Sequence, residues 1–239
     1  MSYSGFFSIN NSLDDTTKAL LKFYLPDGGV IYDPTCGEKN YQFSWLKKSS
    51  TIALDYYCNI TGRRGKAVLQ QQAKEHYRYI CSDLKPTGDF IANVSHLPLK
   101  NKCADATWYD PPFAPTRDSK DPRAKAFGVN ENRTPKQIKE FYSADILKEL
   151  ARVTKKFIFV RGQDIYFPPN TTNFYPFYEM ALHSVKKVKE LEKKPIAEYT
   201  LRYNHGKLPL FRYRLRNVQR PIITYSKIAV LKVKEGAIA

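Results

Sequence analysis

The residues best suited to chemistry are the six at positions 108–113, Trp-Tyr-Asp-Pro-Pro-Phe. An apolar run ends there in an acid, two prolines and an aromatic ring, which predicts a strand followed by a rigid turn. Because proline has no N–H, this turn would present the carboxylate of Asp110 and the carbonyl of Pro111 as hydrogen-bond acceptors. Two acceptors can hold both hydrogens of an exocyclic amine, which is a poor nucleophile until its nitrogen can become pyramidal. The ring of Phe113 could stack on a base that has left its helix.

A second group of interest is Asp33-Pro34-Thr35-Cys36-Gly37, which ends the apolar run at 28–33. A short apolar run bounded by turn residues predicts a buried parallel strand. Asp33, Pro34, Thr35, Cys36 and Gly37 would therefore form a turn directly after this strand, and the group begins 77 residues before Asp110.

These two groups resemble motifs of S-adenosylmethionine-dependent amino-methyltransferases that modify nucleic-acid bases. Asp110, Pro111, Pro112 and Phe113 match the catalytic Asp-Pro-Pro-Phe/Tyr motif, and residues 33–37 match the Asp-Pro-x-Cys-Gly cofactor loop. The resemblance implies a Rossmann-like class I methyltransferase fold with S-adenosyl-L-methionine as the cofactor. It also implies direct in-line transfer, in which Asp110 and the Pro111 carbonyl stabilise the charge that develops on the amine nitrogen.

The resemblance covers residues 28–113 by motif and residues 138–233 only by general pattern. The cofactor loop comes before the catalytic motif, which excludes the permuted class of these enzymes. Residues 38–40, Glu-Lys-Asn, stand where the family has a small residue and another glycine, so we expect the approach to the cofactor to differ there. An ordinary Asp-Pro-Pro loop and a plain strand-to-helix turn remain the alternatives to the two motifs.

Two acids could end the second strand and hold the ribose hydroxyls of the cofactor. Asp55 lies 22 residues after the first acid of the cofactor loop, close to the spacing in a nucleotide-binding βαβ unit. Asp83 opens a stretch that resembles a compact variant of the family, in which an acid-x-x-Pro turn precedes a Leu-Pro segment. We favour Asp83, which makes residues 51–75 an insertion. Asn93 and Val94 would then meet the adenine ring, although the family more often has an aspartate in place of the asparagine.

The elements that must position these residues alternate between strands and helices. Short apolar runs predict strands at 28–33, 51–54, 79–81, 106–109, 157–160 and 228–233. Helical spacing of apolar residues predicts helices at 13–25 and 138–153. This alternation favours an open α/β sheet whose ligands lie beyond the carboxyl ends of the strands. We predict a single methyltransferase domain over residues 1–239, and the resemblance implies seven mostly parallel strands with the last one antiparallel.

Two segments do not have the pattern of a buried element. Residues 114–137 are rich in Pro, Arg, Lys and Asn and predict a long loop, either a lid over base and cofactor or a disordered insertion. Residues 201–225 interleave basic and aromatic side chains, which favours an arm that binds phosphates and stacks on bases over an ordinary solvated hairpin. The predicted nucleic-acid contacts are Arg202, Tyr203, Lys207, Arg212, Arg214 and Arg216.

The composition is that of a basic globular protein. The 239 residues include 39 Lys and Arg against 23 Asp and Glu, and the net charge of +16 favours a polyanionic partner over a basic surface used only for solubility. The four cysteines form no C-x-x-C pair and the four histidines lack ligand spacing, so we predict reduced thiols and no metal. No segment reads as a membrane span or a secretory signal, so we expect an intracellular, cytoplasmic protein.

Taken together, the residues predict methyl transfer from S-adenosylmethionine to the exocyclic amine of adenine or cytosine in DNA. An RNA base methyltransferase and a non-catalytic nucleic-acid-binding subunit with the same fold are the alternatives. The expected partner is nucleic acid, with DNA favoured over RNA. Since no large target-recognition domain follows the catalytic motif, a homodimer or a separate specificity subunit could supply recognition. The absence of a Pro-Cys pair argues against carbon-5 cytosine chemistry.

Overall fold

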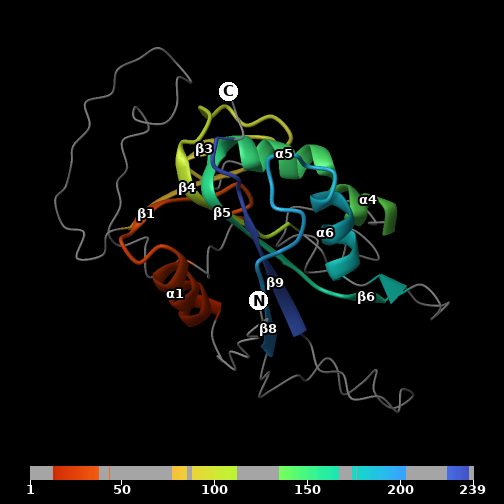
Figure 1. Ribbon diagram of the computed structural model, residues 1–239. Coiled ribbons are helices and arrows are strands. Elements are labelled where there is room, and N and C mark those ends of the chain that lie inside the picture. The colour runs from red at the N-terminus through yellow and green to blue at the C-terminus, as the bar shows by residue number, and fades with distance from the viewer. Residues whose placement is uncertain are drawn as a thin grey trace.

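The computed structural model describes residues 13–37, 43, 77–84, 88–111, 135–166, 174–175, 177–202 and 225–236. Their centre is a seven-stranded sheet with the order β3-β2-β1-β4-β5-β9-β8 (Figure 1). Its strands are β1 (Gly29–Asp33), β2 (Tyr77–Asp83), β3 (Phe90–Ile91), β4 (Ala104–Tyr109), β5 (Thr154–Gly162), β8 (Ala197–Arg202) and β9 (Tyr225–Lys232). A separate short pair consists of β6 (Ile165–Tyr166) and β7 (Phe174–Tyr175). The helices are α1 (Leu13–Tyr24), α4 (Pro135–Glu140), α5 (Ala144–Val153) and α6 (Phe177–Val185).

The strand directions confirm the predicted Rossmann-like arrangement. β1 pairs in parallel with β2 and β4, β2 pairs in parallel with β3, and β4 pairs in parallel with β5. β9 is antiparallel to both of its neighbours, β5 and β8, so the expected antiparallel last strand is confirmed. The carboxyl ends of the six other strands therefore share one edge of the sheet. Ligands of open α/β sheets bind at this edge.

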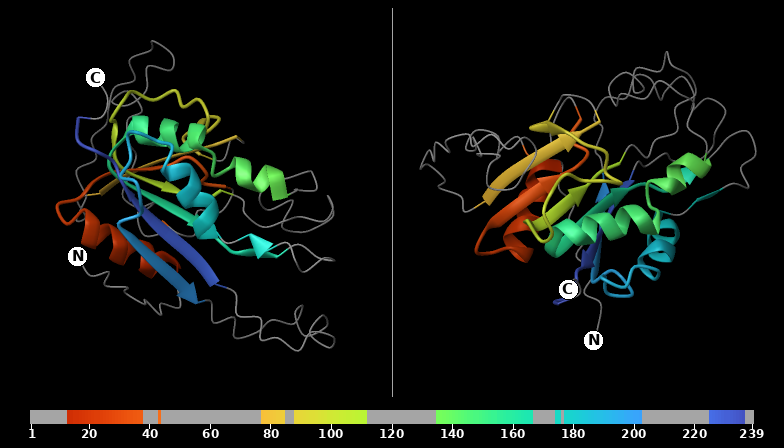
Figure 2. Two further views of the ribbon diagram at one scale, coloured as in Figure 1. Left: turned by 45° about the vertical axis from the view of Figure 1, so that its right-hand side comes forward. Right: turned by 90° about the horizontal axis from the view of Figure 1, so that it is seen from above.

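The sheet has a hydrophobic core on each face. α4, α5 and α6 cover one face, where Leu150 and Phe177 pack with Val160 of β5. α1 covers the other face, where Leu21 packs with Phe159 of β5 (Figure 2). Successive residues of a strand point to opposite faces, so a central strand with apolar residues on both sides is buried on both. The sheet thus holds the ends of β1, β4 and β5 rigidly between two layers of helix.

Trp108 of β4 is fully buried in the core on the α1 face. Its ring stacks on Phe159 with centroids 5.6 Å apart and an angle of 27°, and it meets Phe43 edge-on at 5.6 Å. Among the described residues its Nε1 has no hydrogen-bond partner. Leaving a buried donor unpaired costs about 1–3 kcal/mol, and the aromatic contacts offset part of that cost. Trp108 therefore anchors the strand that leads into the predicted catalytic turn.

The predicted single helix over residues 138–153 is wrong, because the segment is divided between two helices. α4 ends at Glu140 and α5 begins at Ala144. Ser143 caps α5 with an extended backbone (φ −66°, ψ 157°), and its side chain accepts a hydrogen bond from the N–H of Ile146. Apolar residues on both sides of the break face the same core. The helical periodicity therefore continues through the break, and it conceals the cap.

The other predicted elements agree with the structure where it describes them. The predicted helix at 13–25 corresponds to α1. The predicted strands at 28–33, 79–81, 106–109, 157–160 and 228–233 correspond to β1, β2, β4, β5 and β9. The predicted strand at 51–54 lies outside the described residues. β3, β8 and α6 were not predicted.

The two unusual segments fall largely outside the described part of the chain. Of the predicted loop at 114–137, only residues 135–137 are described, and they open α4 instead of ending a loop. Of the predicted arm at 201–225, residues 201–202 end β8 and residue 225 begins β9. None of the described helices has the length and apolar character needed to cross a membrane.

Candidate active site

Three acids end three neighbouring strands at the carboxyl edge of the sheet. Asp83 is the last residue of β2, Asp33 is the last residue of β1, and Asp110 directly follows β4. The strands lie in the order β2-β1-β4. Asp33 pairs in register with Cys81, close to the end of β2. The structure therefore brings the predicted cofactor loop between the favoured ribose acid and the predicted catalytic acid.

The carboxylate of Asp33 shapes the predicted cofactor loop from within. It is fully buried, and its Oδ1 accepts hydrogen bonds from the N–H of Thr35 at 3.0 Å and from the Thr35 hydroxyl at 3.3 Å. Its Oδ2 accepts a hydrogen bond from the hydroxyl of Tyr79 at 3.0 Å. Burial, and then the charge of Asp33, raise the pKa of Tyr79, so this phenol stays a donor. Asp33 thus holds the turn from within.

Thr35 connects the predicted cofactor loop to the predicted catalytic turn. Its Oγ1 donates to Asp33 and also accepts a hydrogen bond of 3.0 Å from the N–H of Asp110. The two groups that sequence analysis singled out separately are therefore joined by one side chain. A displacement of either group would be transmitted to the other.

Gly37 and Asp83 form the other side of the loop. Gly37 has φ +60°, a left-handed conformation that glycine adopts without strain. Its N–H donates to Oδ2 of Asp83 at 2.9 Å. The described β2 ends at Asp83, which is consistent with the preference for Asp83 as the ribose acid, whereas Asp55 lies outside the described residues.

Two exposed apolar side chains at this edge were missed by sequence analysis. Leu84 directly follows Asp83 and is 70% exposed, and Ile91 of β3 is 61% exposed. Asp83 and Ile91 are partners in the β2–β3 register. An exposed Leu or Ile is ordinary by itself, but two beside a predicted ribose acid provide an apolar surface for a flat ring. One indication of this surface was present in the sequence, the apolar Leu84 directly after Asp83.

Cys36 is a buried structural thiol of the loop. It is 3% exposed, and its N–H donates to the carbonyl of Ser82 at 3.2 Å. A hydrogen bond with the thiol of Cys81, followed by burial, raises the pKa of Cys36 far above that of an ordinary thiol. A thiol that stays protonated is a poor nucleophile. Cys36 therefore anchors the loop to β2.

Asn93 lies at the start of a tight turn beyond β3, with its side chain exposed. Its Oδ1 accepts hydrogen bonds from the N–H of Ser95 at 3.0 Å and from the Ser95 hydroxyl at 2.9 Å. Its carbonyl accepts a hydrogen bond from the N–H of His96 at 2.9 Å. Val94 is half-buried against the core. The oxygen of Asn93 is thus used within the turn, and its amide N–H groups are the part that suits a ring nitrogen.

An arginine that sequence analysis missed lies beside the predicted catalytic acid. Nη1 of Arg161, on β5, pairs with Oδ2 of Asp110, and the two side chains are only 13% and 12% exposed. Burial raises the pKa of Asp110 above its ordinary value, and the charge and hydrogen bond of Arg161 oppose that rise. The Pro-Pro turn was expected to offer acceptors only. Its neighbouring strand adds a cationic donor to the site.

The break between α4 and α5 supports the same site. The hydroxyl of Tyr109 donates to the carbonyl of Phe141 at 2.8 Å, within the break. The hydroxyl of Tyr142 donates to the carbonyl of Arg161 at 3.3 Å. Burial is the main cause of the raised pKa of both phenols. Phe141 and Tyr142, which lie in the break between the two helices, therefore hold the ends of β4 and β5.

The remaining predicted site residues are only partly described. Pro111 is buried after the predicted catalytic acid, and Pro34 is buried in the predicted cofactor loop. Pro112, Phe113, Tyr203, Lys207, Arg212, Arg214 and Arg216 lie outside the described residues. Arg202 is described only as the last residue of β8. In the described ranges, no cluster of three His, Cys, Asp or Glu side chains could hold a metal ion.

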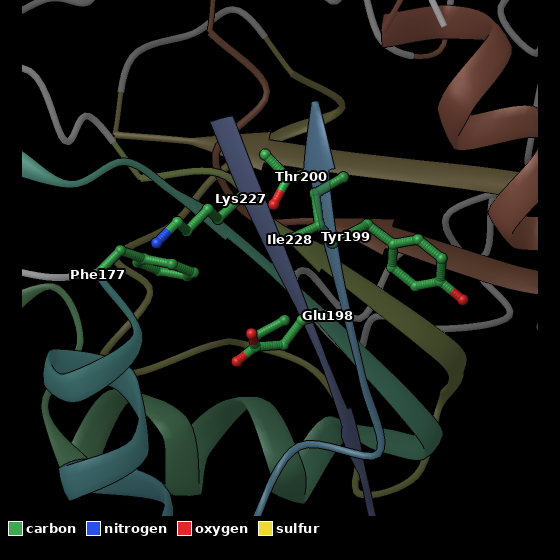
Figure 3. A pocket seen from close by; sticks show the side chains of 7 residues that line it. Phe177, Glu198, Tyr199, Thr200, Lys227 and Ile228 are labelled. Carbon is green, nitrogen blue, oxygen red and sulfur yellow. The ribbon is translucent and has the colours of Figure 1, made fainter. Parts of the chain in front are cut away.

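A small pocket lies on the α6 side of β8 and β9. Its lining comprises Phe177, Glu198, Tyr199, Thr200, Lys227, Ile228 and Ala229. Phe177 and Lys227 lie on one side of the two strands, while the ring of Tyr199 points to the other side (Figure 3). Nζ of Lys227 forms an ion pair with Asp164 at 2.8 Å. None of the predicted cofactor or catalytic residues lines this pocket.

Comparisons with known proteins support the fold. The sequence matches no family model and no curated protein. Among solved structures, the [4+2]-cyclase SpnF has a TM-score of 0.50 at 12% identity, covering 99% of this chain and 89% of that one. The PH0226 protein from Pyrococcus horikoshii OT3 has a TM-score of 0.47 at 13% identity, covering 92% and 89%. A 1,6-didemethyltoxoflavin-N1-methyltransferase from Burkholderia thailandensis has a TM-score of 0.45 at 12% identity, covering 95% and 80%.

The likeness to SpnF extends over almost the whole chain, and at 12% identity it concerns the fold alone. It agrees with the strand order and with the single antiparallel strand. The chain has the class I methyltransferase fold. SpnF is described as a [4+2]-cyclase, so this fold by itself does not determine a reaction. The reaction must be argued from the residues at the carboxyl edge.

Proposed function

We propose that this chain is an S-adenosylmethionine-dependent methyltransferase that acts on the exocyclic amine of adenine or cytosine in DNA. The observation that carries the proposal is the 3.0 Å hydrogen bond between the N–H of Asp110 and Oγ1 of Thr35. It joins two motifs that lie 75 residues apart in the chain, at the edge of the sheet where ligands bind. The neighbouring parallel strands β1 and β4 bring both motifs to this edge, and the hydrogen bond fixes one motif against the other.

The residues around the loop suit the cofactor, which would supply the methyl group as a sulfonium. The backbone at 34–37 would approach its methionine portion, as the motif resemblance implies. Asp83 would accept hydrogen bonds from the ribose hydroxyls. Leu84 would offer an exposed apolar surface to the adenine ring, and Asn93 and Val94 would lie at its edge, where the exposed amide of Asn93 offers hydrogen-bond donors.

The catalytic turn would act on the amine. The carboxylate of Asp110 and the carbonyl of Pro111 would hold its two hydrogens, which leaves the nitrogen lone pair directed at the methyl group. As the N–C bond formed and the C–S bond of the sulfonium broke to leave a neutral thioether, the same two oxygens would stabilise the positive charge on the nitrogen. One proton of the methylated amine would then pass to water. Pro112 keeps the turn rigid, and Phe113 stacks on the unpaired base.

The charge distribution favours nucleic acid as the partner. Residues 203–224 contain five Lys and Arg and no Asp or Glu. The strands on either side, β8 and β9, end and begin at the carboxyl edge that carries the predicted site. A basic segment attached at that edge is suited to the phosphates next to a methylated base. Sequence recognition would come from this segment, from residues 114–137, from a second copy of the chain or from a specificity subunit.

The test is transfer of labelled methyl from S-adenosylmethionine to duplex DNA, single-stranded DNA and total RNA, followed by mass spectrometry of the nucleosides. Asp110→Asn keeps the shape of the side chain, and Asp145→Asn changes an exposed acid on α5 as a matched control. We expect methylated adenosine or amino-methylated cytidine in DNA, lost in Asp110→Asn and retained in Asp145→Asn. Label in RNA alone would favour the RNA enzyme. No label on any polymer, despite cofactor binding, would favour a non-catalytic subunit.

A further inference from the structure

The contact between Arg161 and Asp110 joins two strands at the predicted reaction centre. Tyr109 pairs with Val160 in the β4–β5 register, so the next residue of each strand, Asp110 and Arg161, lie side by side. Nη1 of the arginine contacts Oδ2 of the aspartate. Both side chains are almost nine-tenths buried. Water and salt therefore screen their attraction much less than that of a surface pair.

Arg161 is itself fixed by groups from two other elements. Its Nε donates to Oγ of Ser226 on β9 at 3.0 Å, and Ser226 is 1% exposed. Its carbonyl accepts the hydrogen bond from the hydroxyl of Tyr142. A guanidinium donates in a planar fork, so fixing Nε also fixes the direction of Nη1. The arginine is thus oriented before any substrate arrives.

We infer that Arg161 is a positioning residue, which holds Oδ2 of Asp110 so that the carboxylate stays ionised and turns Oδ1 toward the substrate amine. This inference rests on the proposed function. Within the described part of the chain, no hydrogen bond reaches Oδ1. The backbone N–H of Asp110 is held by Thr35 from the opposite side. Asp110 is therefore held from both sides, its backbone by Thr35 after β1 and its carboxylate by Arg161 on β5, and Oδ1 remains for the amine.

The ionised form matters because both oxygens of a carboxylate accept hydrogen bonds. A protonated carboxyl would present a donor to an amine that already carries two hydrogens. The titratable groups that face Asp110 from the described elements are Tyr109 on β4, Tyr142 between α4 and α5, and Arg161 on β5. Burial keeps both phenols protonated. Arg161 is thus the group among these that favours the carboxylate against burial.

The first test is a titration that does not depend on activity. Carbon-13 NMR of carboxyl-labelled aspartate, with Asp110→Asn to assign the signal, would follow the ionisation of Asp110 in the wild type, Arg161→Met and Arg161→Lys. We expect the methionine variant to raise the pKa by at least about one pH unit, a tenfold change in the ionisation constant. The lysine variant keeps the charge and should show less than half of that rise. A pKa within about 0.3 unit of the wild type in Arg161→Met would overturn the inference.

The second test is the pH profile of kcat/KM for methyl transfer in the same variants. If Arg161 acts through Asp110, the acidic limb in Arg161→Met moves upward in parallel with the titration, and the lost activity returns at high pH. A loss that is equal at every pH would indicate a merely structural role and would overturn the inference. Ser226→Ala, which removes the Nε contact but leaves the ion pair, should lower kcat without moving the limb. If the wild type transfers no methyl group, the proposed function fails, while the titration still reports on Arg161.

Discussion

The hydroxyl of Thr35 is the connection whose removal most directly tests how the site is built. Thr35→Val keeps the branched shape and deletes the hydroxyl that donates to Asp33 at 3.3 Å and accepts from the N–H of Asp110 at 3.0 Å. A neutral hydrogen bond contributes about 1 kcal/mol and one to a charged group about 1.5–3 kcal/mol. The hydrogen bond to the Asp33 carboxylate is long, so we take the lower end of that range, about 1.5 kcal/mol, for its contribution. Because Thr35 is half-buried, water can replace part of the loss, and we expect a decrease of about 2 kcal/mol in the free energy of unfolding.

The assay is urea unfolding followed by circular dichroism, with Thr35→Ser as the matched control that keeps the hydroxyl. For a chain of this length the expected loss corresponds to a fall in Tm of about 4–8 °C. The slope of the unfolding free energy against urea should not change, because the surface exposed on unfolding stays the same. If the valine variant is as stable as the serine variant to within about 0.5 kcal/mol, the hydroxyl does not connect the two motifs, and the reasoning is refuted.

Three further changes test other parts of the structure. In Gly162→Ala the new methyl would lie 2.2 Å from a ring carbon of Phe177, so we expect a loss of at least about 2 kcal/mol in a denaturant titration, and an unchanged midpoint would contradict this packing. For Glu149, burial raises the pKa, but the hydrogen bonds from Arg152 and from the N–H of Leu97, together with the charge of Arg152, outweigh burial and leave the pKa below its ordinary value. The ionised Glu149 therefore stabilises the fold at pH values above its pKa in the unfolded chain, and this stabilisation is lost as the pH falls through its lower pKa in the folded protein. Between about pH 5 and 3 the free energy of unfolding should thus decrease less for Glu149→Gln than for the wild type. Asp83→Asn should weaken S-adenosylmethionine binding about tenfold in calorimetry, as for the loss of a charged hydrogen bond, and equal affinity would argue against its role at the ribose.

The parts of the site that sequence analysis found are those that depend on local patterns. The apolar run that becomes β1 ends in a turn, and the run that becomes β4 ends in Asp110 and two prolines. Each can be recognised within about ten residues because strand and turn preferences act locally. The strand order then follows from the fold class, and it places Asp33 beside Asp110 without knowledge of any side-chain contact.

The parts that were missed depend on contacts between distant residues. Arg161 lies near the end of β5, directly after the apolar run at 157–160, and nothing around it in the sequence indicates that its partner lies 51 residues earlier. Its position comes from the β4–β5 register, which is fixed only when both strands are packed. Ser143 was missed although its signal is local. The apolar residues before and after it continue one helical period, and that long pattern conceals a single capping residue. β3 has only two residues, too few for a period to be recognised.

Trp108 gives the protein an intrinsic optical probe of its proposed reaction centre. The chain contains two tryptophans, Trp45 and Trp108, so Trp45→Phe would leave a single indole two residues before the proposed catalytic aspartate. Its rigid apolar surroundings and its indole N–H, which has no partner among the described residues, should produce blue emission with little quenching by water. A ligand that shifts the end of β4 on binding would change the Trp108 emission, and stopped-flow mixing could follow that change. Binding at the carboxyl edge could therefore be followed in real time without attaching a dye to the protein.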